Sequence, residues 1–454
     1  MSRPLLTVVL AAGKGTRMRS DLPKVLHRIA GRSMLGHVLA LAKAVGGEAL
    51  AVVVGPEMER VRDEAVKATP GAQVFVQERQ QGTADAVLAA RDAIAAHRGD
   101  LLVLFADTPL VTPETVRALL GALDGGASVA VLGFEAREPG SYGRLVTSSD
   151  GELIAIREAK DATEAELAIR LCNSGVMAFR LDAPLDVLDA IGNANAKGEF
   201  YLTDAVEIVR SRGGRAAAVA CDEDEVLGVN ARGELAQAEA IWQRRARAAA
   251  MADGVTMIAP ETVWLSFDTK IGRDVLIEPN VFFGPKVSVE AGAEIKANSY
   301  LEGAEVGAGA RIGPYARLRP GAVLGQKVHV GNFVEVKNTT MGDGAKANHL
   351  AYLGDGAVGA GANIGAGTIF CNYDGFFKHK TEIGDGAFVG SNSALVAPVK
   401  IGAGAYVGSG SVITKDVGEG ALALERSEQE ERPGWAEKFR TLMARRKAAA
   451  SGRS

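Results

Sequence analysis

The chain has 454 residues, too many for one hydrophobic core, so we expect two or three domains. Hydrophobic residues make up 47% and charged residues 23%, which is typical of a soluble globular protein, and a formal net charge of −4 gives no reason to expect nucleic acid as a partner. The three cysteines lie far apart without the paired spacing of metal ligands, which favours a reduced, cytoplasmic setting.

The first apolar run, Leu5–Ala12, is shorter than a membrane span, and no signal-peptide cleavage site follows it. We therefore expect no membrane partner. Residues 1 to 228 alternate apolar runs with helical patterns, which predicts an α/β domain with a Rossmann-like, mostly parallel sheet. The expected strands are Leu5–Leu10, Ala51–Val54, Val74–Gln77, Leu101–Phe105 and Ser128–Phe134, and the expected helices are Met34–Val45, Ala84–His97 and Pro113–Leu120.

Ligands bind beyond the carboxyl ends of the strands in such sheets, so the loops after Leu10 and Phe105 are the first places to look for a site. A stretch from Glu234 to about Ala250 is rich in Ala, Glu, Gln and Arg and free of Pro and Gly, which predicts one helix. We expect an N-terminal domain over 1–228, a linker helix within 229–250 and a second domain over 251–454.

After Met251 apolar residues recur at every sixth position. A six-residue period fits neither an α-helix nor a single flat strand, but it is the repeat of parallel β-helices. Three series follow it: Ile271, Ile277, Phe283, Val289, Ile295, Leu301; Val306, Ile312, Leu318, Leu324, Val330, Val336; and Ile383, Val389, Leu395, Ile401, Val407, Ile413. The rhythm stops between about Phe370 and Thr381, which predicts an inserted loop on a binding side or at a subunit contact. The basic tail after about Gly434 is expected to be helical or frayed.

A glycine-rich turn, Gly13-Lys14-Gly15, follows the first strand. Its backbone N–H groups, with Lys14 and Arg17, could hold a triphosphate, although the spacing matches neither a Walker A motif nor a dinucleotide fingerprint. Lys24 adds a point charge suited to a phosphate oxygen. Taken singly, each of these features is more often structural than functional.

Together, Ala11–Met18 and Leu22–Lys24 resemble the signature of sugar-nucleotide pyrophosphorylases, which join a nucleoside triphosphate to a sugar 1-phosphate and release pyrophosphate. Later segments resemble the same family in order: Gln81–Ala84, Ala106–Pro109, Tyr142–Arg144, Arg157–Asp161, Cys172–Gly175, Phe200–Asp204 and Gly228–Asn230. The resemblance implies Mg²⁺ ligated by Asp107 and Asn230, which suits a reaction that brings two anions together. It also implies that nucleotide and sugar are bound by Leu10, Ala11, Ala12, Gly13, Arg17, Lys24, Gln77, Gly82, Thr83, Phe105, Ala106, Asp107, Gly143, Glu158, Asn173 and Asn230.

The segment from Ile312 to Tyr352 is dense in polar residues that a solenoid does not need. His349, near Arg319, Lys337 and Tyr352, could deprotonate an amine while the cations hold a phosphate. A surface histidine on a coil edge is the plainer interpretation of that residue alone.

These segments, with Asn363–Thr368 and Cys371–Gly375, resemble the acetyltransferase half of a bacterial family of bifunctional N-acetylglucosamine-1-phosphate uridyltransferases and glucosamine-1-phosphate acetyltransferases. The resemblance extends from about Leu6 to Arg426. It implies that His349 is the general base. It further implies a left-handed β-helix, a homotrimer, the substrates UTP and acetyl-CoA, and UDP-N-acetylglucosamine as product, a precursor of peptidoglycan and lipopolysaccharide. The implied contacts to the amino sugar phosphate come from Arg319, Lys337, Tyr352 and Asn363, and those to acetyl-CoA from Ala366, Asn372, Tyr373, Ser391, Ser409 and Arg426.

A few positions depart from the family pattern. Phe105-Ala106 stands where tyrosine-glycine is common, Asp85 where histidine is common, and Ser409 where alanine is frequent. Two alternatives stay open: another sugar or nucleotide could be the substrate, or the β-helix could be a non-catalytic trimerisation scaffold. The cluster around His349 argues against a pure scaffold.

Overall fold

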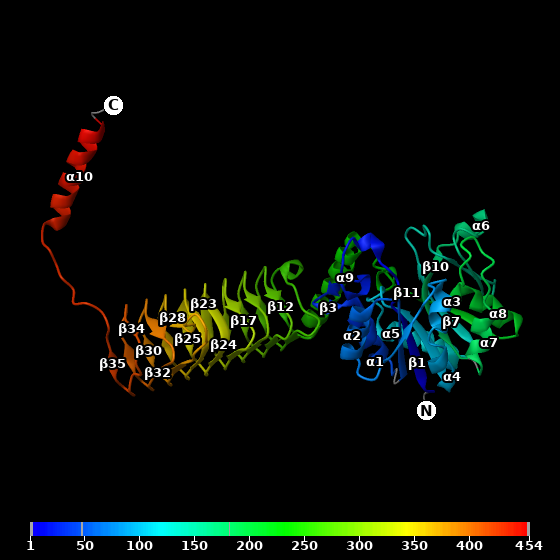
Figure 1. Ribbon diagram of the computed structural model, residues 1–454, viewed down its shortest axis with the longest axis horizontal. Helices are drawn as coiled ribbons and strands as arrows, with labels where there is room; N and C mark the ends of the chain where they lie inside the picture. The colour runs from blue at the N-terminus through cyan, green and yellow to red at the C-terminus, as the bar shows by residue number, and fades with distance from the viewer. Residues whose placement is uncertain (1–2, 47–48, 181, 452–454) are drawn as a thin grey trace. The chain divides into compact units, whose positions relative to one another are not determined.

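The computed structural model describes residues 3–46, 49–180 and 182–451, and the chain divides into two compact units (Figure 1). The first unit comprises Met1–Asp253 and Trp264–Thr269, and the second comprises Gly254–Val263 and Lys270–Ser454. The helix expected as a linker, α9 (Arg232–Ala252), belongs to the first unit. Its buried Gln243 exchanges hydrogen bonds of 2.7 and 2.9 Å with the backbone of Leu265, which ties the short second segment to this unit.

The main sheet of the first unit has the strand order β11-β7-β10-β6-β1-β4-β5. All pairs are parallel except those of β10, which is antiparallel to both β6 and β7, so the expectation of a mostly parallel sheet is confirmed. The strands are β1 (Leu5–Leu10), β4 (Ala49–Val54), β5 (Gln73–Val76), β6 (Asp100–Phe105), β7 (Val129–Glu135), β10 (Leu171–Phe179) and β11 (Ala216–Cys221). Two hairpins add β2 (Arg28–Ile29) with β3 (Arg32–Ser33), and β8 (Arg144–Thr147) with β9 (Leu153–Arg157).

Helices cover both faces of this sheet. Side chains of β1 alternate between two cores, with Val9 in one and Val8 in the other, as the period of a strand requires. The first core is covered by α1 (Met34–Ala44), α2 (Glu59–Ala68) and α5 (Pro113–Asp124), and the second by α3 (Thr83–Leu88), α4 (Arg91–Ala96), α7 (Pro184–Asp189) and α8 (Ala205–Ser211). A short helix α6 (Glu164–Leu167) and the 3₁₀ turns η1 (Thr16–Met18), η2 (Lys24–Leu26), η3 (Leu202–Asp204) and η4 (Glu223–Glu225) lie in the connections.

The prediction of a single helix over Ala84–His97 is wrong, because the structure has two helices there. The amide of Ala90 bonds to the carbonyl of Val87, three residues back, and its backbone leaves the helical region with φ −91° and ψ 22°. This tight turn ends α3 before α4 begins at Arg91. Periodicity alone does not distinguish one helix from two helices that share a buried face.

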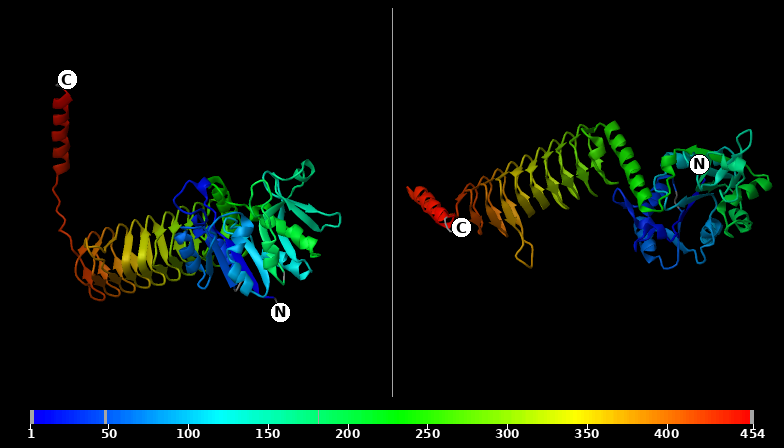
Figure 2. Two further views of the ribbon diagram at one scale, coloured as in Figure 1. Left: turned by 45° about the vertical axis from the view of Figure 1, so that its right-hand side comes forward. Right: turned by 90° about the horizontal axis from the view of Figure 1, so that it is seen from above.

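The second unit is a parallel β-helix, which confirms the prediction made from the hexad spacing (Figure 2). Inward side chains stack directly on their counterparts one coil away, as in the ladder Ile277, Ile295 and Ile312, all fully buried. One sheet contains β12 (Thr256–Met257), β14 (Leu276–Ile277), β17 (Glu294–Ile295), β20 (Arg311–Ile312), β23 (His329–Asn332), β25 (Lys346–His349), β27 (Asn363–Ile364), β30 (Phe388–Val389), β33 (Tyr406–Val407) and β35 (Leu422–Ala423).

The second large sheet of this unit follows the path β13 (Lys270–Ile271), β16 (Ser288–Val289), β19 (Ala304–Val306), β22 (Ala322–Leu324), β24 (Glu335–Met341), β26 (Tyr352–Val358), β28 (Ile369–Cys371), β31 (Ala394–Val396) and β34 (Val412–Ile413). It branches at the two long strands β24 and β26, which each pair with strands of two faces. The branches are β15 (Phe282–Phe283), β18 (Tyr300–Leu301) and β21 (Arg317–Leu318) on one side, and β29 (Thr381–Ile383) and β32 (Val399–Ile401) on the other.

The break in the hexad rhythm is an inserted loop, as expected. Between β28 and β29 the backbone forms only one bridge, Tyr373 to Lys378, and the loop stands out from the coils in the right-hand view of Figure 2, coloured between yellow and orange. The tail forms a helix, α10 (Trp435–Ser451), with no buried residue. A short 3₁₀ turn, η5 (Pro260–Thr262), precedes the first full coils.

Candidate active sites

Two adjoining hollows lie at the carboxyl edge of the sheet in the first unit, with volumes of about 190 and 350 Å³. Both are lined by Ala12, Gly13, Gln77, Gly82 and Thr83. The smaller hollow is also lined by Leu10, Ala11, Lys24, Phe105 and Asp107, and the larger by Glu158. The loops after β1 and β6 therefore meet at one site, where a parallel sheet places its ligands.

Lys24 connects residues that are far apart in the sequence. Its ammonium lies 2.5 Å from an Asp107 carboxylate oxygen and 3.0 Å from the Asn230 amide oxygen, and its side chain is only 8% exposed. The amide of Val229 bonds to the carbonyl of Asp107, which fixes the two loops together. Gly15 packs against this lysine: a Cβ added there would lie 2.4 Å from the Cβ of Lys24. The oxygens of Asp107 and Asn230 thus converge on a position that already accommodates a positive charge.

The expected sugar-binding residues form a second group beside the larger hollow. The amide of Asn173 bonds to the carbonyl of Gly143, and a Cβ at Gly143 would meet a carboxylate oxygen of Glu158 at 3.4 Å. Burial raises the pKa of Glu158, and nearby Asp161 acts in the same direction while Lys197 opposes it. A side chain at position 143 would therefore crowd the Glu158 carboxyl, which lines the larger hollow.

Five expected residues do not line these hollows: Arg17, Ala106, Gly143, Asn173 and Asn230. Ala106 is fully buried, and its amide bonds to the carbonyl of Leu10, so it supports the turn from within. Arg17 is exposed on η1 and makes no side-chain hydrogen bond or ion pair with any described residue. Sequence reasoning missed Gln80, Lys197 and Glu199, which line the larger hollow. Lys197 and Glu199 come shortly before the family-like segment Phe200–Asp204. This proximity was the signal by which the sequence could have identified them.

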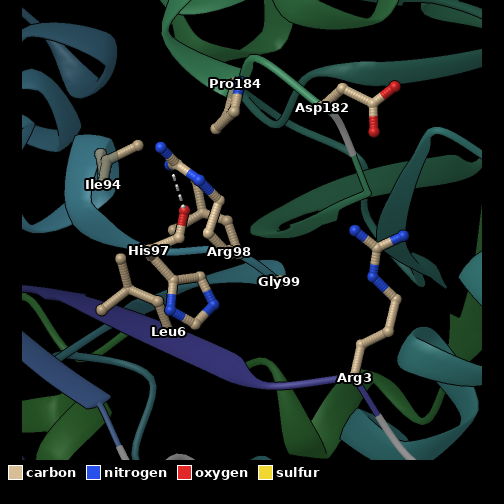
Figure 3. Close-up of a pocket in the computed structure, with 9 residues that line it drawn as sticks. Arg3, Leu6, Ile94, His97, Arg98, Gly99, Asp182 and Pro184 are labelled. Atoms are coloured by element: carbon tan, nitrogen blue, oxygen red, sulfur yellow. Dashed lines mark hydrogen bonds between the residues drawn. The ribbon is translucent and has the colours of Figure 1, made fainter.

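A third cavity of about 120 Å³ lies at the opposite end of the sheet, where β1 and β6 begin (Figure 3). Arg3, His97, Arg98 and Asp182 line it, together with apolar residues. Arg98 donates hydrogen bonds to the backbone carbonyls of Ala95 and His97, at 2.9 and 3.1 Å. None of the residues expected from the sequence lines this cavity, so it is separate from the site above.

In the β-helix, His349 ends strand β25 and is exposed. Its Nδ1 lies 2.6 Å from the amide oxygen of Asn332, which is paired with it one coil earlier. An amide oxygen accepts, so in the neutral imidazole Nδ1 carries the hydrogen and the lone pair is on Nε2. This is the form of imidazole that can act as a base.

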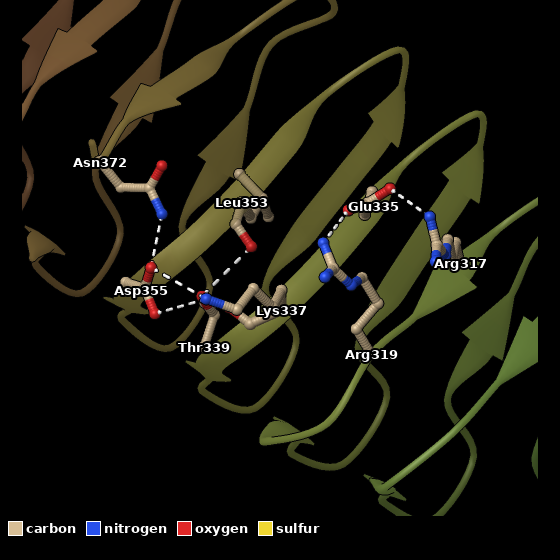
Figure 4. A network of polar contacts seen from close by, with 8 residues as sticks. All are labelled: Arg317, Arg319, Glu335, Lys337, Thr339, Leu353, Asp355 and Asn372. Atoms are coloured by element: carbon tan, nitrogen blue, oxygen red, sulfur yellow. Dashed lines mark hydrogen bonds and ion pairs between the residues drawn. The ribbon is translucent and has the colours of Figure 1, made fainter. Parts of the chain in front are cut away.

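Two ion pairs order the neighbouring cations (Figure 4). Arg319 donates to Glu335 at 2.7 Å, and Lys337 lies 3.1 Å from Asp355. Burial raises the pKa of Asp355, but hydrogen bonds from Asn338, Lys337 and Asn372 outweigh it and hold the pKa below its ordinary value. The hydrogen bond from Asn372 is 2.5 Å long and joins the inserted loop to this cluster.

Four of the residues expected to bind acetyl-CoA follow His349 along one edge of the coils: Ala366, Ser391, Ser409 and Arg426. Backbone hydrogen bonds link successive corners: Gly367 to His349, Asn392 to Ala366, and Gly410 to Ser391. Arg426 donates to the carbonyl of Ser409 at 2.9 Å and so continues the row. Tyr373 stands on the inserted loop with 61% of its surface exposed, and Asn363 lies on β27, next to β25.

Sequence reasoning gave no role to Asn332, Glu335, Asp355 or Lys378, which the structure brings to this cluster. The like charge of the Lys337 ammonium lowers the pKa of the Lys378 amine. Glu335 and Asp355 each lie one coil from the cation they pair with. A search for opposite charges one coil apart would have found both.

No group of three or more His, Cys, Asp and Glu side chains that could hold a metal occurs in the part of the chain that the structure describes. A cation at Asp107 and Asn230 would therefore complete its coordination with substrate oxygens and water. Among residues 3–46, 49–180 and 182–451, no helix is long and apolar enough to span a membrane.

The chain was compared with known proteins. The family model of the MobA-like NTP transferase domain matches residues 7–171, and the bacterial transferase hexapeptide model (six repeats) matches residues 380–415. The chain is 60% identical over 445 residues to the bifunctional protein GlmU of Azorhizobium caulinodans, covering 98% of this chain and 99% of that one. It is also 60% identical, with the same coverage, to the bifunctional protein GlmU of Xanthobacter autotrophicus. A crystal structure described as UDP-glucose pyrophosphorylase complexed with UDP-glucose aligns at 17% identity with a TM-score of 0.43, over 53% of this chain and 99% of that one.

Proposed function

We infer that the chain, which belongs to the family of bifunctional GlmU proteins, makes UDP-N-acetylglucosamine by two group transfers. Acetyl-CoA and glucosamine 1-phosphate give N-acetylglucosamine 1-phosphate in the β-helix, and UTP then gives the nucleotide sugar and pyrophosphate in the first unit. The observation that carries this proposal is the convergence of scattered polar motifs on one cluster in each unit: Lys24 with Asp107 and Asn230, and His349 with Asn332 beside the paired cations.

In the acetyl transfer, we assign His349 as the general base. Its Nε2 accepts a proton from the amine of glucosamine 1-phosphate as the nitrogen attacks the thioester carbonyl. A C–N bond forms, the C–S bond breaks, and coenzyme A leaves as the thiol after taking up a proton. Arg319 and Lys337, already ordered by their ion pairs, hold the sugar phosphate together with Tyr352.

In the uridylyl transfer, an oxygen of the sugar 1-phosphate attacks the α-phosphorus of UTP in line with the departing pyrophosphate. Lys24 is placed to stabilise the charge that develops on the phosphates, since its ammonium is buried and held at the site. The carboxylate of Asp107 and the amide oxygen of Asn230 are hard oxygen donors that suit Mg²⁺, and they already face a cation, so we assign them as its ligands. When bound, Mg²⁺ would neutralise phosphate charge.

We also propose that the chain works as a cytoplasmic homotrimer built through the β-helix. Stacked aromatic pairs stand on its surface, Phe282 with Tyr300 and Phe388 with Tyr406, at ring-centroid distances of 5.0 and 4.5 Å. Several exposed apolar side chains on one domain favour a contact between subunits. Light scattering after size-exclusion chromatography would measure the mass, and a monomer at micromolar concentration would contradict this assignment.

The two-reaction proposal is tested by a coupled assay with glucosamine 1-phosphate, acetyl-CoA, UTP and Mg²⁺, in which each component is omitted in turn. Pyrophosphate release should require all four components. When N-acetylglucosamine 1-phosphate replaces the amino sugar, acetyl-CoA should become dispensable. Pyrophosphate release from glucosamine 1-phosphate at the same rate without acetyl-CoA would contradict the order of steps.

A further inference from the structure

The side-chain amide of Gln77 is held by two neighbours in the wall that the two hollows share. Gln77 is 6% exposed and lines both hollows. Its Nε2 donates to the backbone carbonyl of Gly82 at 3.0 Å and to a carboxylate oxygen of Asp85 at 2.7 Å. Asp85 is itself fixed, because it also accepts a hydrogen bond from the amide of Gln81 at 3.1 Å.

These contacts determine which polar atom Gln77 can offer to a ligand. A glutamine amide has two N–H donors and one oxygen. Both neighbours can only accept, so the amide cannot be turned end for end without placing its oxygen against a carbonyl and a carboxylate. Both donors are used, and no described residue donates to the oxygen. Gln77 therefore presents an acceptor to the ligand.

We propose that Asp85 is a positioning residue that sets the nucleobase specificity of the uridylyl transfer by holding Gln77 as an acceptor. This rests on the proposed function, in which UTP binds in these hollows, and adds that Gln77, which lines both of them, faces the base of UTP. The imide N3–H of uracil donates to such an acceptor. Cytosine has a lone pair at N3, which would face the Gln77 oxygen with no hydrogen between them, and leaving such a pair unsatisfied in a buried site is costly.

The test compares kcat/KM for UTP with kcat/KM for CTP, using the full-length protein, N-acetylglucosamine 1-phosphate and Mg²⁺. We expect the wild type to prefer UTP strongly. In Asp85→Ala the amide keeps only the Gly82 contact and can turn, so the UTP-to-CTP ratio should fall about tenfold or more. Asp85→Asn retains an oxygen acceptor and should restore most of the ratio.

Asp92→Ala, which removes an exposed aspartate on the next helix, α4, is the matched control and should leave the ratio unchanged. If Asp85→Ala is unstable by thermal melting, Asp85→Leu, which has a similar shape and no acceptor, replaces it. An unchanged ratio in a folded Asp85→Ala or Asp85→Leu would overturn the role of Asp85 while leaving the uridylyl transfer intact. A wild type that used CTP as well as UTP would overturn the placement of Gln77 against the base of the nucleotide.

Discussion

His349 and Asn332 form a hydrogen bond of 2.6 Å between Nδ1 of the imidazole and the oxygen of the amide, across neighbouring coils. The bond orients the ring and selects the tautomer with a free lone pair on Nε2. We expect Asn332→Ala to lower kcat for acetyl transfer about tenfold, a fraction of the 10²–10⁴ that a general base supplies. In Asn332→Asp the carboxylate should stabilise the imidazolium, so the acidic limb of the pH–rate profile should move to higher pH. A profile that stays in place would mean that Asn332 does not contact the reacting histidine.

The two activities should be separable, because their clusters lie in different compact units. We expect His349→Ala to lower acetyl transfer by about 10²–10⁴ while uridylyl transfer persists. Asp107→Ala should have the opposite effect, because the variant loses the carboxylate that pairs with Lys24 and that we assign to Mg²⁺. Each activity is measured alone, with its own sugar phosphate. Loss of both activities from either folded variant would rule out independent sites.

The sequence predicted the β-helix well because its hexad period is a property of every coil, so each buried residue such as Ile295 or Val330 repeats the same signal. It also predicted the order of the strand–helix units, because apolar runs and helical patterns alternate along residues 1 to 228. The sequence did not predict β10, although this strand lies inside the sheet between β7 and β6, because it carries the polar Asn173 and Ser174 with a register shift between Asn173 and Met177. Such a strand lacks a continuous apolar run.

The chemistry of the candidate sites was predictable from the sequence where a single residue type indicates it, as with His349 or Asp107. The partners that orient these residues were not predictable from the sequence. Asn332, Glu335 and Asp355 act through pairing across coils, and the sequence does not show which side chains the coils bring together. The same holds for Asp85, which stood out only as a departure from a family pattern and whose contact with Gln77 required the fold.

The buried carboxylate of Asp355 should make the β-helix sensitive to acid. Its pKa is held below the ordinary value of about 3.9, so it stabilises the folded state above that pH, and this contribution is lost as pH falls through the folded pKa. We expect Asp355→Asn to lose on the order of 2 kcal/mol of stability at pH 7, since three donors lose a charged acceptor. The difference in melting temperature between the variant and the wild type should shrink below pH 4. The Asp355→Asn variant should also have a higher KM for glucosamine 1-phosphate, because Lys337 loses the counterion that orders it.

Gly15 offers a test of how closely the glycine-rich turn must approach Lys24. Its φ is +62°, and a Cβ there would lie 2.4 Å from the Cβ of Lys24. Gly15→Ala should therefore add a collision with Lys24 to the cost of about 1–2 kcal/mol for a left-handed alanine. Gly71 is the matched control, because its φ is +96° and nothing lies within 4 Å of its added Cβ. Both variants should melt at lower temperature, but only Gly15→Ala should lower kcat/KM for uridylyl transfer, by about tenfold or more, since Lys24 moves away from Asp107. Equal activities in the two variants would show that the close packing at Gly15 does not position the lysine.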